Sequence, residues 1–349
     1  MIDPPLRAEV DQAIDRELAR VRDRAGAMSE PFAALGDATA RAAAGGKRLR
    51  PALVLAAFDA YDGAPARRPA AVDVAVAFEL LHTAFVVHDD VIDHDVVRRG
   101  IPNIGGEFRV RGRGRGADAA GAATLGDAAA ILAGDLLLHE AARLVALTDL
   151  PGTVRRDVYD LLDDAVYVSA AGELSDVENA VAAVSADTDD ALGTAFNKTA
   201  VYSFRAPLCA GALLAGADAA QRELLAHAGG RLGLAFQLVD DLIGAFGTAE
   251  QAGREVGGDL REAKRTPLVA MARETAHRAR VDDAIALAHT GPLAVADAQR
   301  AIEDSGARVE LTVLAETTLA RVRDDAKRLP TEAGALLRQL ADRIEERIP

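Results

Sequence analysis

The feature that most constrains the fold is a long apolar run, residues 70–94, which contains few helix breakers and ends in a dense acidic cluster. The cluster and its continuation read HDDVIDHDVVRRG (88–100), in which four aspartates fall within seven residues and two arginines follow. An apolar run of this length predicts a buried helix. Because like charges one turn apart repel, the acidic end of this helix requires a positive partner.

The rest of the chain also favours helices. Ala and Leu, the best helix formers, are abundant, whereas aromatic residues make up only 4% of the chain. No alternating strand pattern, repeat or Pro/Ser-rich linker is present, so we expect one all-α domain over residues 1–349. Loops are expected at 101–122 and 248–266. The expected helices span 6–27, 51–62, 70–94, 125–147, 153–184, 188–214, 219–247, 267–279, 281–289, 293–304, 308–327 and 331–347.

Charge and cysteine content exclude several classes of protein. The formal net charge of −14 disfavours bulk binding to nucleic acid or to an anionic membrane. Cys209 is the only cysteine, which excludes an internal disulfide and fits a reducing compartment. No signal peptide and no window of 18 uncharged apolar residues is found. We therefore expect a cytoplasmic protein with no transmembrane segment and no nucleic-acid partner.

The Arg–Gly run at 109–116 is the one feature that could indicate RNA binding. It is short, lacks interleaved aromatic residues beyond Phe108, and lies in an acidic chain. We expect it to form a flexible solvent loop instead.

Two aspartate pairs are candidates for a site because each ends an apolar run: Asp89–Asp90 and Asp240–Asp241. On a helix, residues four apart share one face, so Asp89 and Asp93 project together, and His82 lies about two turns earlier at a similar azimuth. Hard divalent ions suit such carboxylates, Mg²⁺ above all, which commonly bridges them to substrate phosphates. Histidine and cysteine are too sparse for a zinc site.

Basic residues supply the opposite charge. GGKRLRP (45–51) places Lys47, Arg48 and Arg50 at the start of an apolar helix, where its two glycines permit close approach of a ligand and the helix N-terminus favours an anion. Arg98 and Arg99 follow the first acidic cluster. Lys198 lies in a mostly apolar helix and Lys264 in a loop. Basic residues beside magnesium-binding carboxylates imply a bound polyanion, for which phosphate is the natural choice.

Taken together, these motifs resemble the trans-isoprenyl diphosphate synthases, the all-α polyprenyl synthetase family. GGKRLRP resembles the family's first basic motif, and ELLHTAFVVHDDVIDHDVVRRGIP (79–102) resembles its first DDxxD motif with the trailing RRGxP. KT (198–199), FQLVDD (236–241) and GGDLREAK (257–264) follow in the family's order. The resemblance implies a large helical bundle around a central cavity and a homodimer.

The resemblance also implies a role for each matching residue. Three Mg²⁺ ions per site are implied, held by Asp89 and Asp93 with Asp90 in support, and by Asp240 with Asp241 nearby. Isopentenyl diphosphate is then held by Lys47, Arg50, His82 and Arg99, and the allylic diphosphate by Arg98, Lys198 and Lys264. Thr199 and Gln237 lie near the reacting carbons, where their oxygens stabilise developing cationic character.

The chain departs from the family pattern in its second acidic motif. This motif reads DDLIG, so Gly244 stands where the family often has its last aspartate. The loss removes a carboxylate one turn from Asp240, and it is also compatible with a subunit that acts only in a heteromer.

The implied reaction is ionisation of the allylic diphosphate, attack of the isopentenyl double bond on the allylic cation in a dry site, and loss of a proton from the resulting cation to the departing pyrophosphate. In the family, bulky residues four and five positions before the first motif shorten the product. Here these are Phe85 and Ala84, one aromatic and one small, which favours C20 geranylgeranyl over C15 farnesyl diphosphate. A farnesyl or longer-chain synthase, a terpene cyclase and a non-catalytic partner subunit are the alternatives. GGKRLRP, His82 and Arg99 count against a cyclase, which needs no second diphosphate site.

Overall fold

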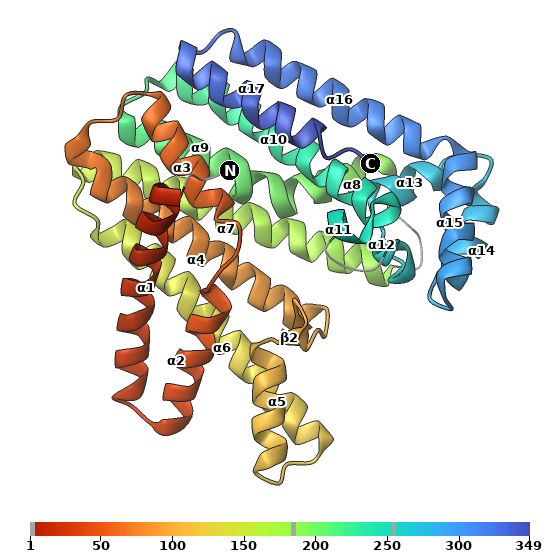
Figure 1. Ribbon diagram of the computed structural model, residues 1–349, viewed down its shortest axis with the longest axis horizontal. Helices are drawn as coiled ribbons and strands as arrows, with labels where there is room; N and C mark the ends of the chain where they lie inside the picture. The colour runs from red at the N-terminus through yellow and green to blue at the C-terminus, as the bar shows by residue number, and fades with distance from the viewer. Residues whose placement is uncertain (1–3, 183–185, 253–255) are drawn as a thin grey trace. The chain divides into compact units, whose positions relative to one another are not determined.

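The computed structural model describes residues 4–182, 186–252 and 256–349 (Figure 1). Helices dominate, which confirms the all-α class. The strands within the described residues are β1 (Val97–Arg98) and β2 (Ile101–Pro102), a minimal antiparallel hairpin. The chain divides into two compact units, unit 1 (residues 1–162 and 213–215) and unit 2 (163–212 and 216–349). Each unit is described by itself, and the expectation of one domain stays a prediction.

Unit 1 is built around α4 (Arg68–Ile92), the apolar run of the sequence. This helix packs against the other helices of the unit, and its Phe78, Leu80 and Leu81 are fully buried. Burying one such side chain stabilises the fold by about 1.5–3 kcal/mol. Figure 1 shows α1 and α2 as a neighbouring pair. The surrounding elements are α1 (Pro4–Gly26), α2 (Glu30–Ala43), α3 (Leu49–Ala60), η1 (Pro65–Arg67), α5 (Ile104–Gly114) and α6 (Ala119–Leu147).

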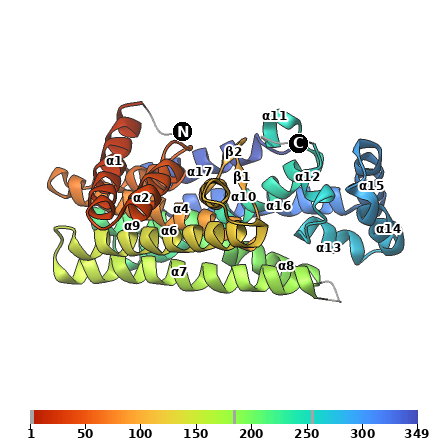
Figure 2. The ribbon, with the colours of Figure 1, turned by 90° about the horizontal axis from the view of Figure 1, so that it is seen from below.

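Unit 2 is built around α10 (Ala219–Phe246), which packs against η2 (Phe196–Arg205), α16 (Ala307–Ala326) and α17 (Thr331–Glu345). These helices lie side by side in Figure 1, and Figure 2 shows the pair α14 (Arg278–Ala288) and α15 (Pro292–Ser305). Gly233 lets η2 approach α10, because a Cβ there would lie 2.5 Å from Ala200 Cα. The remaining elements are α8 (Thr188–Ala195), α11 (Ala249–Ala252), α12 (Gly258–Arg261) and α13 (Pro267–Arg273), while α7 (Gly152–Val181) and α9 (Ala206–Ala215) contribute residues to both units.

The expected loop at 101–122 is wrong, because most of it forms α5 and the start of α6. The Asn103 side chain caps α5 by accepting a hydrogen bond from the Gly106 N–H at 2.8 Å. The glycines of this segment permit close packing, since a Cβ at Gly112 would lie 3.3 Å from Ala122 Cα. Two of its arginines, Arg111 and Arg115, form ion pairs with Glu30. The absence of a nucleic-acid partner stays a prediction.

Three further regions of the chain differ from the sequence prediction. Helix α2 was not expected, although Ser29 caps it and Pro31 lies in its first turn. The expected loop at 248–266 contains the short helices α11 and α12. The helix expected at 188–214 is formed, but its middle segment, η2, has π-helical hydrogen bonding. π-helical segments are rare in proteins, and those that occur often lie at functional sites. The segment η2 carries Lys198 and Thr199.

Two stretches, Pro65–Ile92 and Ala119–Leu147, are long and apolar enough to cross a membrane by length and composition. In the first, 78% of the apolar window is buried inside the fold, as in the core helix of a non-membrane protein. In the second, 39% is buried, and Leu125, Ile131 and Leu132 are exposed. The absence of a transmembrane segment therefore stays a prediction.

Candidate active site

The first acidic motif lies where α4 ends. Asp89 and Asp90 occupy its last turn, and Asp93 is its C-cap, whose N–H donates to the Asp89 carbonyl at 2.8 Å. Asp90 is buried, Asp89 is partly exposed and Asp93 is exposed. Carboxylates are unfavourable at a helix C-terminus, because the helix dipole places negative potential there. This end of α4 is therefore a site that attracts cations.

One stripe of α4, a mostly buried helix, stays partly open. His82, Phe85, Val86 and Asp89 are all partly exposed, whereas Thr83, Ala84 and Val87 between them are buried. The open positions follow i, i+3, i+4 and i+7, so they form one face of the helix. The structure thus places Phe85 on the same face as the first acidic motif and Ala84 in the core.

Arg98 provides positive charge at the acidic end of α4. Its Nε donates to Asp90 Oδ1 at 2.8 Å, and its Nη2 lies 3.9 Å from Asp89 Oδ2. Burial raises the pKa of the Asp90 carboxyl, while the hydrogen bond and charge of Arg98 act in the opposite direction. Arg98 holds carboxylates in this structure, and its expected contact with a diphosphate stays a prediction.

The hairpin turn after Arg98 brings the RRG segment to the first basic motif. Arg99 and Gly100, the two residues between β1 and β2, have φ of +54° and +78°, as in the tight primed hairpin turns. A Cβ at Gly46 would lie 3.9 Å from Arg99 Nη2 and 3.9 Å from Glu79 Oε1. Two sequence motifs about fifty residues apart therefore meet in unit 1.

Within GGKRLRP, the three basic residues have different environments. Arg48 is buried, adopts a left-handed φ of +52°, and pairs with Asp11 at 2.7 Å and Glu79 at 3.1 Å. A left-handed arginine is uncommon and is held here by these ion pairs. Lys47 is exposed and Arg50 partly exposed. Arg48 thus holds the loop, and Lys47 and Arg50 have surface to meet a ligand.

His82 lies among the basic residues of unit 1. Burial lowers the pKa of its imidazole well below the ordinary value, and the positive charges of Arg50, Arg98, Arg99 and Arg48 lower it further. The ring is therefore neutral at physiological pH, where it donates one hydrogen bond and accepts another. Unit 1 thus brings His82 together with three arginines predicted to bind diphosphates.

The second acidic motif lies near the C-terminal end of α10 in unit 2. Asp241 is buried, and it accepts a hydrogen bond on Oδ1 from Gln237 Nε2 at 2.9 Å. Its Oδ2 is buried and has no hydrogen-bond partner within the part of the chain that the structure describes. Burial raises the pKa of Asp241 well above its ordinary value; Gln237 opposes this effect, and the negative charges of Asp259 and Asp240 reinforce it. Such a group is neutralised either by a proton or by a nearby cation.

Asp240 is contacted by an arginine that the sequence did not single out. Arg347, two residues beyond α17, forms an ion pair with Asp240, and its guanidinium lies 4.7 Å above the Phe236 ring. Both charged side chains are about a third exposed. The segment around Arg347, IEERIP, matches no motif, so only the fold reveals this contact.

Lys198, on the π-helical segment, faces α7. Its Nζ donates to Asp176 Oδ2 at 2.8 Å and to Glu173 Oε1 at 3.1 Å. Gly172 permits this approach, because a Cβ there would overlap the backbone of Lys198. The neighbouring Thr199 is partly exposed. The structure therefore places Lys198 among carboxylates in unit 2, as it places Arg98 in unit 1.

Lys264 and the segment before it meet the second acidic motif. The Lys264 Nζ lies 3.3 Å from Glu262 Oε2 and 3.7 Å from Asp259 Oδ1. Asp259 is buried on α12, and its carboxylate lies against Gly244. Asp259, like Arg347, was missed, although it stands in the quoted GGDLREAK.

The donors present suit magnesium. Among the described residues, no group of three or more His, Cys, Asp or Glu side chains is arranged to hold a metal by itself. Mg²⁺ does not need such a cage, because it keeps several waters and binds through one or two carboxylates plus substrate phosphates. Oxygen donors of this kind are present at the end of α4, in Asp89 and Asp93, and near the end of α10, in Asp240. The orphaned Oδ2 of Asp241 is consistent with a cation nearby.

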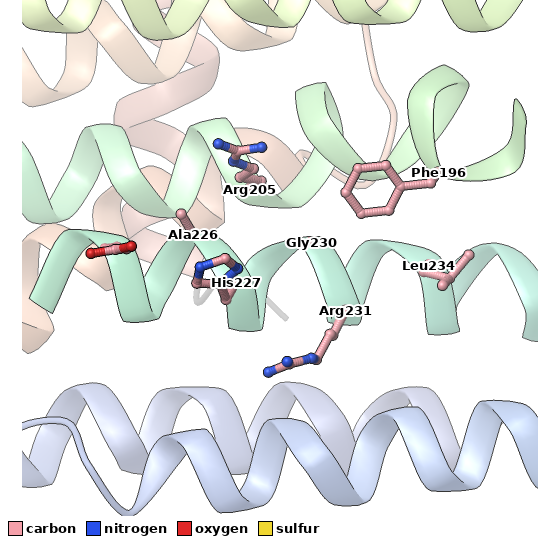
Figure 3. A pocket seen from close by; sticks show the side chains of 8 residues that line it. Phe196, Arg205, Ala226, His227, Gly230, Arg231 and Leu234 are labelled. Carbon is pink, nitrogen blue, oxygen red and sulfur yellow. The ribbon is translucent and has the colours of Figure 1, made fainter. Parts of the chain in front are cut away.

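A separate cavity of about 450 Å³ lies between η2 and α10 (Figure 3). Figure 3 shows Phe196 and Arg205 on η2 above His227 and Arg231 on α10. Arg231 pairs with Asp325. None of the residues predicted to act in catalysis lines this cavity. It is therefore distinct from the second acidic motif.

The chain is similar to known proteins in sequence and in structure. Residues 33–304 match the polyprenyl synthetase family model. The geranylgeranyl diphosphate synthase of Sulfolobus acidocaldarius is 34% identical over 64% of this chain, which spans 62% of that relative's length. The geranylfarnesyl diphosphate synthase of Aeropyrum pernix is 32% identical over 87% of this chain and 91% of its own. The crystal structure of a geranylgeranyl pyrophosphate synthase from Corynebacterium glutamicum, complexed with isoprenyl diphosphate and magnesium, is 26% identical, covers 99% of both chains and has a TM-score of 0.87.

Proposed function

The chain belongs to the polyprenyl synthetase family, a family of prenyl-transferring enzymes, and on that premise we propose that it condenses isopentenyl diphosphate with an allylic diphosphate to give a trans-prenyl diphosphate. The observation that carries the proposal is the end of α4. There Asp89 and Asp93 lie one turn apart, beside Arg98 and on the same open face as His82. Carboxylates for a metal and basic groups for a phosphate thus occur in one unit.

The proposed roles follow from the charges. Asp89 and Asp93 hold magnesium in unit 1, with Asp90 in support, and Asp240 holds it in unit 2, with three ions in all. The three residues predicted to bind the allylic diphosphate each contact a carboxylate in this structure: Arg98, Lys198 and Lys264. Each would exchange that carboxylate for phosphate oxygens when the substrate binds. A guanidinium or ammonium binds phosphate oxygens through charge-assisted hydrogen bonds, which makes the exchange feasible.

Magnesium and the chain's own residues would promote the reaction together. Bound magnesium would withdraw charge from the departing diphosphate. Arg98, Lys198 and Lys264 donate hydrogen bonds to the oxygens on which negative charge develops. Lys47, Arg50, His82 and Arg99 orient isopentenyl diphosphate so that its double bond faces the allylic carbon. The oxygens of Thr199 and Gln237 stabilise the cationic carbon, and the apolar face around Phe85 excludes the water that would quench it.

We propose geranylgeranyl diphosphate, C20, as the main product. Support comes from Phe85, which lies on the open face of α4 one turn before Asp89, where its ring would limit the growing hydrocarbon tail. Ala84 is fully buried, so Phe85 is the member of the pair that meets the tail. Farnesyl and longer products are the alternatives.

We also propose that the chain acts as a cytoplasmic homodimer. The support is an exposed apolar stripe on α6, formed by Leu125, Ala128, Ile131 and Leu132 at helical spacing. An exposed stripe of this kind is typical of a protein interface. A second copy of the same helix would bury it, and Leu132→Arg would then yield a monomer by light scattering.

Labelled isopentenyl diphosphate, supplied with C5, C10 and C15 allylic primers to the purified chain, tests the proposed reaction. We expect incorporation into a C20 product in the presence of Mg²⁺ and none after chelation. A cyclic hydrocarbon without incorporated label would indicate a terpene cyclase. Full turnover without any divalent ion, or incorporation only after a second protein is added, would contradict the proposal.

A further inference from the structure

The glycine that interrupts the second acidic motif lies against a carboxylate from another segment. Gly244 is buried four residues after Asp240, on the same face of α10. A Cβ built there would overlap Asp259 Oδ2, and it would lie 2.6 Å from Asp259 Cγ and 3.4 Å from Asp259 Cβ. The Asp259 carboxylate therefore fills the space that an aspartate side chain at position 244 would enter.

The fold holds Asp259 in this place. Residue 259 lies in the first turn of α12, which packs against α10, and Gly257 before it has a left-handed φ of +68°. A Cβ at Gly257 would overlap Val295 Cγ1, so glycine is needed for this approach. The Asp259 side chain is 10% exposed, and Lys264 Nζ lies 3.7 Å from its Oδ1.

Three carboxylates, those of Asp240, Asp241 and Asp259, thus gather at the end of α10. A cluster of like charges is costly unless cations are present. Asp241 is 5% exposed, and its Oδ2 has no hydrogen-bond partner among the described residues, although buried carboxylate oxygens are nearly always bonded. An orphaned oxygen within such a cluster indicates that a ligand with positive charge completes the site.

We propose that Asp259 supplies, from α12, the carboxylate that the second acidic motif lacks at position 244. In this role it is a positioning residue, which holds the Mg²⁺ bound by Asp240 through the ion's water shell. The inference rests on the proposed function, because it assumes that this site binds magnesium with a diphosphate. Gly244 then is not a defect of the motif but a requirement, since any side chain at that position displaces Asp259.

A carboxylate exchange between the two positions tests the inference. The measurement is the apparent Mg²⁺ affinity in the presence of inorganic pyrophosphate, by calorimetry, for Asp259→Ala, Gly244→Ala, Gly244→Asp and the double variant Gly244→Asp/Asp259→Ala. We expect Asp259→Ala to weaken binding about 10- to 100-fold, the usual effect of removing an outer partner of a metal site. Gly244→Ala should weaken it similarly, because the methyl group displaces the carboxylate.

The two remaining variants give the inference its sharpest form. Gly244→Asp alone, which restores the family motif, should weaken binding because two carboxylates compete for one space. The double variant should return to within about threefold of wild type. Asp325→Asn, which removes a carboxylate that pairs with Arg231 in the same unit, is the matched control and should leave Mg²⁺ affinity unchanged.

The outcomes separate the inference from the proposed function. If the wild-type chain fails to bind Mg²⁺ with pyrophosphate, the proposed function fails and the inference fails with it. If wild type binds but Asp259→Ala binds equally well, the inference alone is overturned. The inference is also overturned if the double variant does not recover Mg²⁺ affinity and the thermal unfolding midpoints of the variants, measured in the presence of chelator, fall in parallel with their Mg²⁺ affinities. Asp259 would then be a structural partner of Lys264.

Discussion

The central helices α4 and α10 each place an aspartate pair near their C-terminal end, yet the surroundings of the two pairs are built differently. In unit 1 the supporting charge is local, since Arg98 follows Asp90 by eight residues and the hairpin directs the next arginine to Gly46. In unit 2 the supporting groups are remote, with Arg347 pairing to Asp240 across 107 residues and Asp259 reaching Gly244 from α12.

The difference shows why the two motifs tolerate change unequally. A cluster whose charged residues all lie in one short segment loses its geometry when one of them is replaced, because no other element supplies a similar group. A cluster assembled from several segments can lose one carboxylate, as at Gly244, and receive another from a neighbouring element. We therefore expect the first motif to be the more sensitive of the two.

The largest effect should come from neutralising one aspartate in each motif. Asp89→Asn should lower kcat by about a thousandfold, because the loss of a metal ligand removes charge stabilisation from the transition state. Asp240→Asn should cost about ten- to a hundredfold, since Asp241 and Asp259 remain. Steady-state incorporation of isopentenyl diphosphate measures both, with Asp325→Asn as control. Equal losses for the two variants would remove the contrast between the units.

The next effect concerns product length. Phe85→Ala should lengthen the product by at least one C5 unit. The substitution removes the ring that is proposed to limit the growing hydrocarbon tail of the substrate. Chromatography of the prenyl alcohols measures the shift. The matched variant in unit 2, Phe236→Ala, removes the ring beneath Arg347 and should leave product length unchanged. An unchanged product length in Phe85→Ala would contradict the proposal that Phe85 limits the hydrocarbon tail.

The arginines around His82 should make the free energy of unfolding depend on pH. The pKa of His82 is lowered in the folded state, so the unfolded chain takes up the proton more readily. This stabilising contribution is therefore complete above the unfolded pKa, about 6.5, and is lost as pH falls towards the folded pKa. One proton gives a slope of at most about 1.4 kcal/mol per pH unit.

Urea unfolding of His82→Gln between pH 7.5 and 5 provides the measurement. This variant should lose less free energy of unfolding on acidification than wild type does. His289→Gln, at an exposed histidine of unit 2, is the control. If the unfolding free energy of His82→Gln changes with pH as steeply as that of wild type, the pKa of His82 is not lowered by its surroundings in the folded state.

The smallest effect should come from Arg347. Because Arg347 and Asp240 are partly exposed, their ion pair is worth about 1 kcal/mol or less. Arg347→Gln removes a cation that competes for Asp240, so Mg²⁺ alone should bind up to about fivefold more tightly. Arg343→Gln, at an exposed arginine one turn earlier, is the matched control. Weaker Mg²⁺ binding in Arg347→Gln would mean that this arginine supports the metal site rather than competing with it.

How much could be predicted from sequence follows the same division. The apolar runs of α4 and α10 and the motifs at their ends are local patterns, and they predicted both core helices and the family. Helix α5 was missed because its formation depends on the Asn103 cap, on glycines packed against α6 and on the distant Glu30. Asp259 and Arg347 were missed because their contacts arise only when remote segments pack. The cap of α2 at Ser29, by contrast, was a readable local signal.

The central claim is that the acidic end of α4 binds a diphosphate through magnesium. The affinity for inorganic pyrophosphate, measured by calorimetry with Mg²⁺ and with chelator for wild type and for Asp89→Asn, tests this claim most directly. We expect Mg²⁺ to strengthen pyrophosphate binding to wild type and to strengthen it much less in Asp89→Asn, because the variant lacks a carboxylate that would hold the ion. An equal gain from Mg²⁺ in the two proteins would contradict the claim.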